Sequence, residues 1–228
     1  MSVEAIVVSQ EGMISGVKIE SAKSMTIPDE GKFLDEVMDV ERSAWPPELQ
    51  ATKEKFASRL HVFPEGFFVA KVDGKISGVT TSQITTYDPS VTKTWDEITD
   101  NGMIAKTHSP EGNALYVVSV GVAKEAQGNH VGGQIVEKQK ELALGLGLKY
   151  LYLGARIPGY DKYCKEHGEL TIEKYLETKD SDGEAVDPEI RFYNRRGLQV
   201  KKIISEFEAD NDSRNYGAVM VWENPQKA

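Results

Sequence analysis

One short segment combines the residue types that bind an anion through the backbone. The segment Gln127-Gly128-Asn129-His130-Val131-Gly132-Gly133 lies between an apolar run that ends at Val122 and a helical pattern that continues to about Leu146. A glycine-bearing turn between a strand and a helix leaves backbone N–H groups free, and the helix dipole favours a negative ligand beside them. No Ser, Thr or Asp stands at the helix start to accept these groups. The segment therefore predicts a phosphate site, with a purely structural turn as the alternative.

Two widespread phosphate-binding motifs do not match this segment. In the dinucleotide fingerprint G-x-G-x-x-G, the middle glycine would be His130. A P-loop requires Lys and then Ser or Thr after its last glycine, whereas Gly133 is followed by Gln134 and Ile135. The sequence therefore argues against both of these nucleotide-binding motifs.

The segment resembles the [Gln/Arg]-x-x-Gly-x-Gly/Ala pyrophosphate loop of the GCN5-related N-acetyltransferases, the GNAT superfamily. The preceding Val122-Ala-Lys-Glu-Ala-Gln127 is similar to the family's Val-x-Pro-x-x-[Arg/Gln] approach. His130 stands where the first loop glycine of the family usually lies, and Gly132 takes the place of the second. Histidine enters the left-handed backbone region more readily than most residues, at a cost of roughly 1 kcal/mol. This departure bears on cofactor affinity rather than on the fold.

Three further stretches extend the resemblance along the chain. Phe192-Tyr193-Asn194-Arg195-Arg196-Gly197-Leu198 is similar to the family's late Tyr-x-x-x-Gly-Phe motif, with Leu in place of Phe, and Glu41-Arg-Ser-Ala-Trp45-Pro46-Pro47 resembles the end of its first helix. Gly154-Ala-Arg156-Ile-Pro158-Gly159-Tyr160, with the later Asp187-Pro188, resembles a GNAT subgroup often joined to nitrilase-like amidohydrolases. No such hydrolase is expected within these 228 residues.

The order of the predicted elements is also that of the GNAT fold. Apolar periodicity and turn signals predict a first core strand that ends near residue 22, helices over 29–45 and 48–60, a hairpin over 66–84, a strand over 114–122, a helix over 131–146, a strand over 149–153, a short helix over 171–178, a helix over 189–196, and strands over 198–206 and 215–222. The resemblance implies an α/β protein with a mixed, mostly antiparallel, splayed sheet and helices on both faces. We expect one domain over 1–228, with an N-terminal extension over about 1–16 and an insertion over about 156–190.

The resemblance assigns roles to particular residues, most of them through their main chain. Acetyl-CoA is the implied cosubstrate, and Tyr193 falls on the tyrosine that protonates the leaving thiolate, with a tyrosine packed on the core as the alternative. The implied cofactor-binding residues are Val120, Gly121 and Val122 for the pantetheine and the thioester carbonyl, and Gln127, Gly128, Asn129, His130, Val131, Gly132 and Gly133 for the pyrophosphate.

The general base is not assigned by the sequence. Many GNAT enzymes carry an acidic residue on the central strand, but residues 114–122 contain none. Glu20, Glu41 and Asp161 are candidates by their expected proximity to the acceptor. Arg195 and Arg196 either pair with the 3′-phosphate of CoA or are solvated helix charges.

Composition excludes several other classes of protein. A net charge of −9 and a pI near 5.1 argue against a nucleic-acid-binding protein that relies on a basic surface. The single cysteine, Cys164, excludes an internal disulfide, and the four histidines lack metal-ligand spacing, so we expect no metal. No signal layout and no apolar run of transmembrane length is present, which predicts a cytoplasmic protein without a membrane partner.

The sequence therefore predicts an acetyl-CoA-dependent N-acetyltransferase in which a primary amine attacks the thioester directly in a ternary complex. The expected acceptor is a small amine or an amino-acid-like metabolite, with a protein acceptor as the other option. The alternatives are a noncatalytic acyl-CoA-binding or interaction protein on a degenerate GNAT scaffold, and an unrelated α/β protein with a nucleotide site. The insertion either covers the acceptor pocket or serves as a structural element or a contact in a homodimer.

Overall fold

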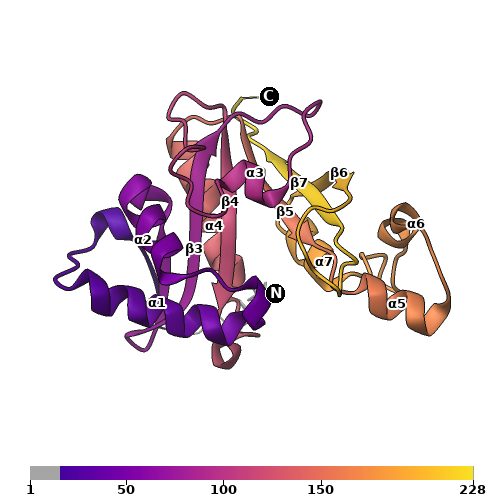
Figure 1. Cartoon of the computed structure of the whole chain (residues 1–228), viewed down its shortest axis with the longest axis horizontal. Helices are drawn as coiled ribbons and strands as arrows, with labels where there is room; N and C mark the ends of the chain where they lie inside the picture. The colour runs from indigo at the N-terminus through magenta and orange to yellow at the C-terminus, as the bar shows by residue number, and fades with distance from the viewer. Residues whose placement is uncertain (1–15, 228) are drawn as a thin grey trace, which may run out of the picture.

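A seven-stranded sheet forms the centre of the protein in a computed structural model that describes residues 16–227 (Figure 1). The strand order is β1-β2-β3-β4-β5-β7-β6, and neighbours are antiparallel except for the β4–β5 pair. The strands are β1 (Val17–Ser21), β2 (Phe68–Val72), β3 (Lys75–Thr85), β4 (Ala114–Val122), β5 (Tyr150–Arg156), β6 (Gln199–Ile204) and β7 (Gly217–Glu223). The predicted fold class, a mixed and mostly antiparallel sheet with helices, is confirmed.

The sheet splits at its one parallel pair. β4 and β5 are in register only from Ala114↔Tyr150 to Tyr116↔Tyr152. Beyond that point β4 stays paired with β3 as far as Val122, whereas β5 stays paired with β7 as far as Arg156. The two halves of the sheet therefore diverge, and within residues 16–227 no strand pairs with residues 117–122 of β4 on the β5 side.

Helices cover both faces of the sheet. The helix α1 (Glu30–Ala44) lies with α2 (Lys53–Val62) on one face, where Phe33, Val37 and Phe56 form a core with Phe67 and Val69. The helix α4 (Val131–Gly145) covers the other face. The remaining helices are α3 (Trp95–Thr99), α5 (Tyr160–His167), α6 (Ile172–Glu177) and α7 (Pro188–Asn194). None of the helices within residues 16–227 is both long enough and apolar enough to cross a membrane.

Local sequence signals explain where the helices near the site begin and end. The side chain of Asp29 accepts a hydrogen bond from the Lys32 N–H at the start of α1, and α1 ends at Trp45 because Pro46 follows. Asp187 caps α7 in the same way, and Pro188 takes the first helical position, where its missing N–H costs nothing.

Several predicted boundaries need correction. The second helix begins at Lys53 rather than near residue 48, because Pro47–Leu49 form a separate 3-10 turn. Two helices form where the sequence predicted none: α3, which a capping box between Thr94 and Glu97 stabilises, and α5, which buries Tyr160 and Cys164. β5 continues to Arg156 instead of ending at residue 153. Almost all of the predicted N-terminal extension over about 1–16 lies outside the described residues, and the single-domain organisation with this extension and the insertion over about 156–190 stays a prediction.

Phe207, in the loop between β6 and β7, packs against the diverging half of the sheet. Its buried ring lies directly over Gly154 on β5 and Gly217 on β7, where an added Cβ would stand 2.0 Å and 2.3 Å from ring carbons. Glycine is therefore needed at both positions, because any side chain there would displace the ring.

Replacing Gly154 by alanine should lower the free energy of unfolding by about 1 to 3 kcal/mol, since the new methyl group overpacks against Phe207. The matched control is Gly145→Ala at the end of α4, where an added Cβ meets no atom within 4 Å. That change should raise stability by about 0.5 to 1 kcal/mol through helix propensity. Urea unfolding of both variants tests the pair, and equal effects of one sign would contradict it.

Candidate active site

The start of α4 offers unbonded backbone donors. His130 precedes the helix in the left-handed region, with φ of 59° and ψ of 6°, and no side chain caps the helix. Gly128 is also left-handed, with φ of 80°. In the part of the chain that the structure describes, the first helical N–H groups after His130 therefore lack an intrahelical acceptor and a side-chain acceptor, which suits them to an anion.

These donors open onto a groove of about 480 Å³. The predicted residues Val120, Val122, Gln127, Gly128, His130, Val131, Gly132, Gly133 and Tyr193 all line it. Gly121 and Asn129 are not among the lining residues, because Gly121 is turned towards Trp45 and Glu41, under α1. The groove therefore joins the loop before α4 to the edge of β4 that faces the split in the sheet.

Arg196 places a cation against the loop. Its guanidinium lies 3.8 Å from the centroid of the Phe192 ring, and Nη1 donates a hydrogen bond to the Phe192 carbonyl at 2.6 Å. A Cβ on Gly133 would stand 2.2 Å from Nη2 of Arg196, so only glycine lets the guanidinium lie so close to the helix start. Arg195, in contrast, forms an exposed ion pair with Glu184. Of the two arginines, only Arg196 lines the groove.

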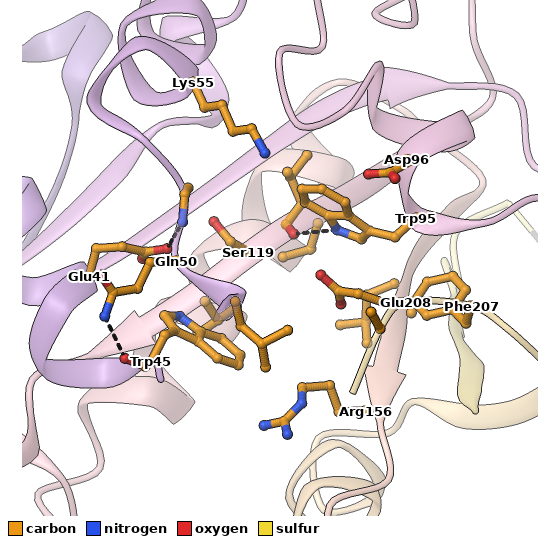
Figure 2. Close-up of a pocket in the computed structure, with 18 of the residues that line it drawn as sticks. Glu41, Trp45, Gln50, Lys55, Trp95, Asp96, Ser119, Arg156, Phe207 and Glu208 are labelled. Atoms are coloured by element: carbon orange, nitrogen blue, oxygen red, sulfur yellow. Dashed lines mark hydrogen bonds between the residues drawn. The ribbon is translucent and has the colours of Figure 1, made fainter. Parts of the chain in front are cut away.

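A second cavity, of about 270 Å³, adjoins the groove on the other side of the split (Figure 2). It lies between α1 and α2, the edge of β4, and the loop that carries Phe207. The groove and the cavity share four lining residues, Trp45, Val120, Glu189 and Tyr193. Two ligands that enter from opposite sides would therefore meet at these residues.

The free edge of β4 supplies main-chain groups at the junction. Nε1 of Trp95 donates to the Val118 carbonyl at 3.2 Å, and Nε2 of Gln127 donates to the Val122 carbonyl at 3.0 Å. Peptide groups of alternate strand residues point to the same edge, so those of Val120 face the split as well. No strand pairs with them there.

Glu189 and Tyr193 stand one helical turn apart on α7, and both line the groove and the cavity. Oε1 of the half-buried Glu189 accepts a hydrogen bond from the Arg156 N–H at 3.2 Å, and burial raises the pKa of this carboxyl to about 8. Burial, and then the charge of Glu189, raise the pKa of Tyr193 well above its usual value. Glu189 was not among the residues predicted from the sequence, although its spacing of four from Tyr193 on a predicted helix was a usable signal.

The other acidic candidates separate into one that lines the cavity and two that do not. Oε1 of the buried Glu41 accepts from the Ala51 N–H at 2.7 Å, and burial raises its pKa. Glu20 instead pairs with lysines on β1 and β2, and Asp161 pairs with Arg214 and with a lysine on its own helix. Glu208, which the sequence analysis also missed, lines the cavity, and burial raises its pKa to about 7.

The segment between β5 and α7 holds α7 in place through one buried carboxylate. Oδ1 of Asp187 accepts from the N–H groups of Glu189 and Ile190 at 3.0 and 3.1 Å. Oδ2 accepts from the Gly159 N–H at 2.9 Å and from the Tyr175 hydroxyl at 3.2 Å. Gly159 precedes α5 and Tyr175 belongs to α6, so these helices are tied to the start of α7.

Comparisons with known proteins agree with this geometry. The profile of the Acetyltransferase (GNAT) family matches residues 32–162. The chain is 33% identical over 196 residues to the uncharacterized N-acetyltransferase YkwB of Bacillus subtilis (strain 168). This match covers 84% of each protein. It is 32% identical over 205 residues to the probable hydrolase YhcX of the same organism, which covers 89% of this chain and 39% of that protein.

Solved structures share the fold. The loading GNATL domain of CurA from Lyngbya majuscula has a TM-score of 0.76 at 18% identity, covering 91% of this chain and 97% of that one. The GphF GNAT-like decarboxylase in complex with isobutyryl-CoA has a TM-score of 0.73 at 21% identity, covering 91% and 98%. At these identities the likeness concerns the fold alone.

Glu189→Gln should stabilise the protein in a pH-dependent way. The folded-state pKa of about 8 lies above the ordinary value of 4.5, so the folded state binds more protons than the unfolded state between these values. Stability therefore falls as pH rises through that window. The neutral amide removes this penalty, and we expect a gain of about 1 to 2 kcal/mol above pH 8 that vanishes below about pH 4.5.

Urea unfolding across this pH range measures the effect. Glu177→Gln, at an exposed position at the end of α6, is the control and should change stability by less than about 0.5 kcal/mol. A gain of equal size at pH 4 and pH 9 would refute the assignment of a raised carboxyl pKa to Glu189.

Proposed function

Because this chain belongs to the Acetyltransferase (GNAT) family, we propose that it transfers the acetyl group of acetyl-CoA to a primary amine by direct attack in a ternary complex. The observation that carries the proposal is the junction at which the groove and the cavity share Trp45, Val120, Glu189 and Tyr193. A thioester from the groove and an amine from the cavity would reach each other there.

The residues of the groove fit acetyl-CoA. Free N–H groups at the start of α4 and the guanidinium of Arg196 suit the phosphates. The unpaired edge of β4 suits the amides of the pantetheine, and the apolar walls of Trp45 and Phe192 suit its methylene groups. In this proposal the main chain from Gln127 to Gly133 holds the pyrophosphate. The main chain of Val120 and Val122, which faces the split, binds the pantetheine and polarises the thioester carbonyl, whereas Gly121 faces β3.

Glu189 is the proposed general base. The acceptor enters as an ammonium ion and must lose protons for nitrogen to form the amide bond. A carboxyl group whose pKa burial raises to about 8 is a far better proton acceptor than an ordinary glutamate near neutral pH. Glu189 lines both the groove and the cavity, so in this proposal the amine lies beside it at the junction.

Tyr193 is the proposed general acid. As the new C–N bond forms, the C–S bond breaks and the electron pair goes to sulfur, which takes a proton to leave as the CoA thiol. Burial keeps the Tyr193 phenol protonated at neutral pH. Two protons leave the nitrogen in all: one offsets the proton that Tyr193 gives to sulfur, and the other passes from Glu189 to solvent. Glu189 and Tyr193 lie one turn apart on α7.

Glu189→Gln and Tyr193→Phe should each lower kcat by about 10²- to 10⁴-fold with little change in the Kd of CoA. In the wild type, kcat should rise with pH up to about 8, and Glu189→Gln should lose this dependence because the titrating base is gone. Thiol release across an amine panel gives kcat, and calorimetry gives the Kd.

Each outcome bears on a different part of the proposal. Unchanged turnover in Tyr193→Phe would refute its assignment as the acid. Failure of CoA to bind at high micromolar concentration would eliminate both acetyl transfer and CoA sensing. Binding without turnover of any amine would favour the noncatalytic acyl-CoA-binding alternative.

A second candidate is decarboxylation of an acyl-CoA whose acyl group ends in a carboxylate. The cavity beside the junction contains Lys55, a cation that forms no ion pair with a described residue, and one protein of the same fold is a GNAT-like decarboxylase. Incubation with malonyl-CoA in the absence of any amine separates the two functions. Formation of acetyl-CoA and CO₂ would favour decarboxylation.

A further inference from the structure

One wall of the cavity presents a cation without a carboxylate partner. Lys55 projects from α2, and its amino group points into the cavity (Figure 2). It lies 5.6 Å from the centroid of the Trp95 ring and forms no ion pair with any residue in the described part of the chain. Lys53, two residues earlier, instead pairs with Asp35 at 2.5 Å outside the cavity. The two lysines of one helix therefore have different surroundings.

A second cation stands behind the same wall. Arg59 follows Lys55 by one helical turn and is 1% exposed. Its Nε donates to the Gly102 carbonyl at 2.7 Å, and Nη1 donates to the hydroxyl of Ser119 at 3.2 Å. Its Nη2 has no hydrogen-bond partner among the described residues. Ser119 lines the cavity, so this wall combines a hydroxyl polarised by Arg59 with the amino group of Lys55.

The facing wall carries carboxyl groups. Glu208 points into the same space as Lys55 in Figure 2. Arg156 also lines the cavity, but its guanidinium pairs with Asp210, and no described cation lies within ion-pair distance of Glu208 or Glu189. Glu41 is buried on the opposite side of the cavity from Glu208, near Lys55 and Arg59, and its Oε2 is unbonded among the described residues. Trp45 and Trp95 line the space between the two walls.

A ligand with a single sign of charge would leave one wall without a partner. A simple amine would place a cation near Lys55 without compensation, and a simple carboxylate would lie against Glu208 and Glu189. Desolvating an uncompensated charge is costly, so a cavity of this kind selects against both ligands. A ligand that carries an amine and a carboxylate satisfies both walls.

We propose that the acceptor of the proposed acetyl transfer is a free amino acid, whose amine faces Glu189 and whose carboxylate binds Lys55 and the hydroxyl of Ser119. The volume of about 270 Å³ suits one small molecule of this size. The inference rests on the proposed function, and it assigns Lys55 as the residue that determines specificity for a carboxylate.

The test compares each of a set of amino acids with its own α-carboxamide as acceptor. The wild type should prefer the acid by about 10- to 100-fold in kcat/KM, the range expected for a hydrogen bond to a charged group. Lys55→Met should abolish this preference by raising KM for the acid, with kcat and the KM of the amide little changed. Lys55→Arg should retain most of the preference because it keeps the charge.

Lys53→Met is the matched control, since it removes a lysine of the same helix outside the cavity, and it should keep the wild-type preference. Absence of acetyl transfer to any amine would refute the proposed function itself. Transfer with equal use of acids and amides, or an unchanged preference in Lys55→Met, would overturn the inference and leave the function standing. If Lys55→Met instead slows decarboxylation of malonyl-CoA without an amine, the carboxylate belongs to the acyl group and the inference is likewise overturned.

Discussion

The early end of the β4–β5 pairing is the constraint on which the rest of the structure depends. After Tyr116↔Tyr152, β4 follows β3 and β5 follows β7, so the interior contains a strand edge whose peptide groups need other partners. Trp95 and Gln127 satisfy two carbonyls of that edge. The remaining groups are available to a ligand, and the groove and the cavity lie on either side of them. The split in the sheet thus produces both binding spaces and the point at which they meet.

Two helices contribute functional groups to the spaces on either side of this split. The start of α4 contributes uncapped N–H groups because His130 adopts a left-handed conformation and supplies no cap. The short helix α7 contributes Glu189 and Tyr193 on one face, where burial raises the pKa of the Glu189 carboxyl to about 8 and keeps the Tyr193 phenol protonated near neutral pH. Neither helix could contribute to the site if β4 and β5 stayed paired along their whole length. The helix α7 contacts β5 at the diverging end, and its side chains line both the groove and the cavity.

The sequence predicted most of the elements and the phosphate loop because these depend on local signals. Alternating apolar residues, the Asp73-Gly74 turn and the glycines before α4 are readable without coordinates. The carboxyl groups at the junction are not, because their role depends on burial by segments far apart in the chain. In the sequence, Glu189 resembles an ordinary acidic residue in the first turn of a helix that begins after Asp187-Pro188. Glu20 and Asp161 were predicted as candidate bases instead, but the structure holds both in ion pairs away from the junction. The positions of Lys55 and Arg59 relative to the cavity likewise depend on how α2 packs over β4, which the sequence alone does not show.

The contacts of Asp187 also connect the site to the projecting helices α5 and α6 (Figure 1). One carboxylate caps α7 and accepts hydrogen bonds from Gly159 and Tyr175, so loosening of either helix would disturb the start of α7. Thermodynamic linkage then runs in both directions. A molecule that binds α5 and α6 and shifts them would change the affinity of the junction for its ligand. Binding of that ligand at the junction would change the affinity of the molecule for α5 and α6 by the same factor.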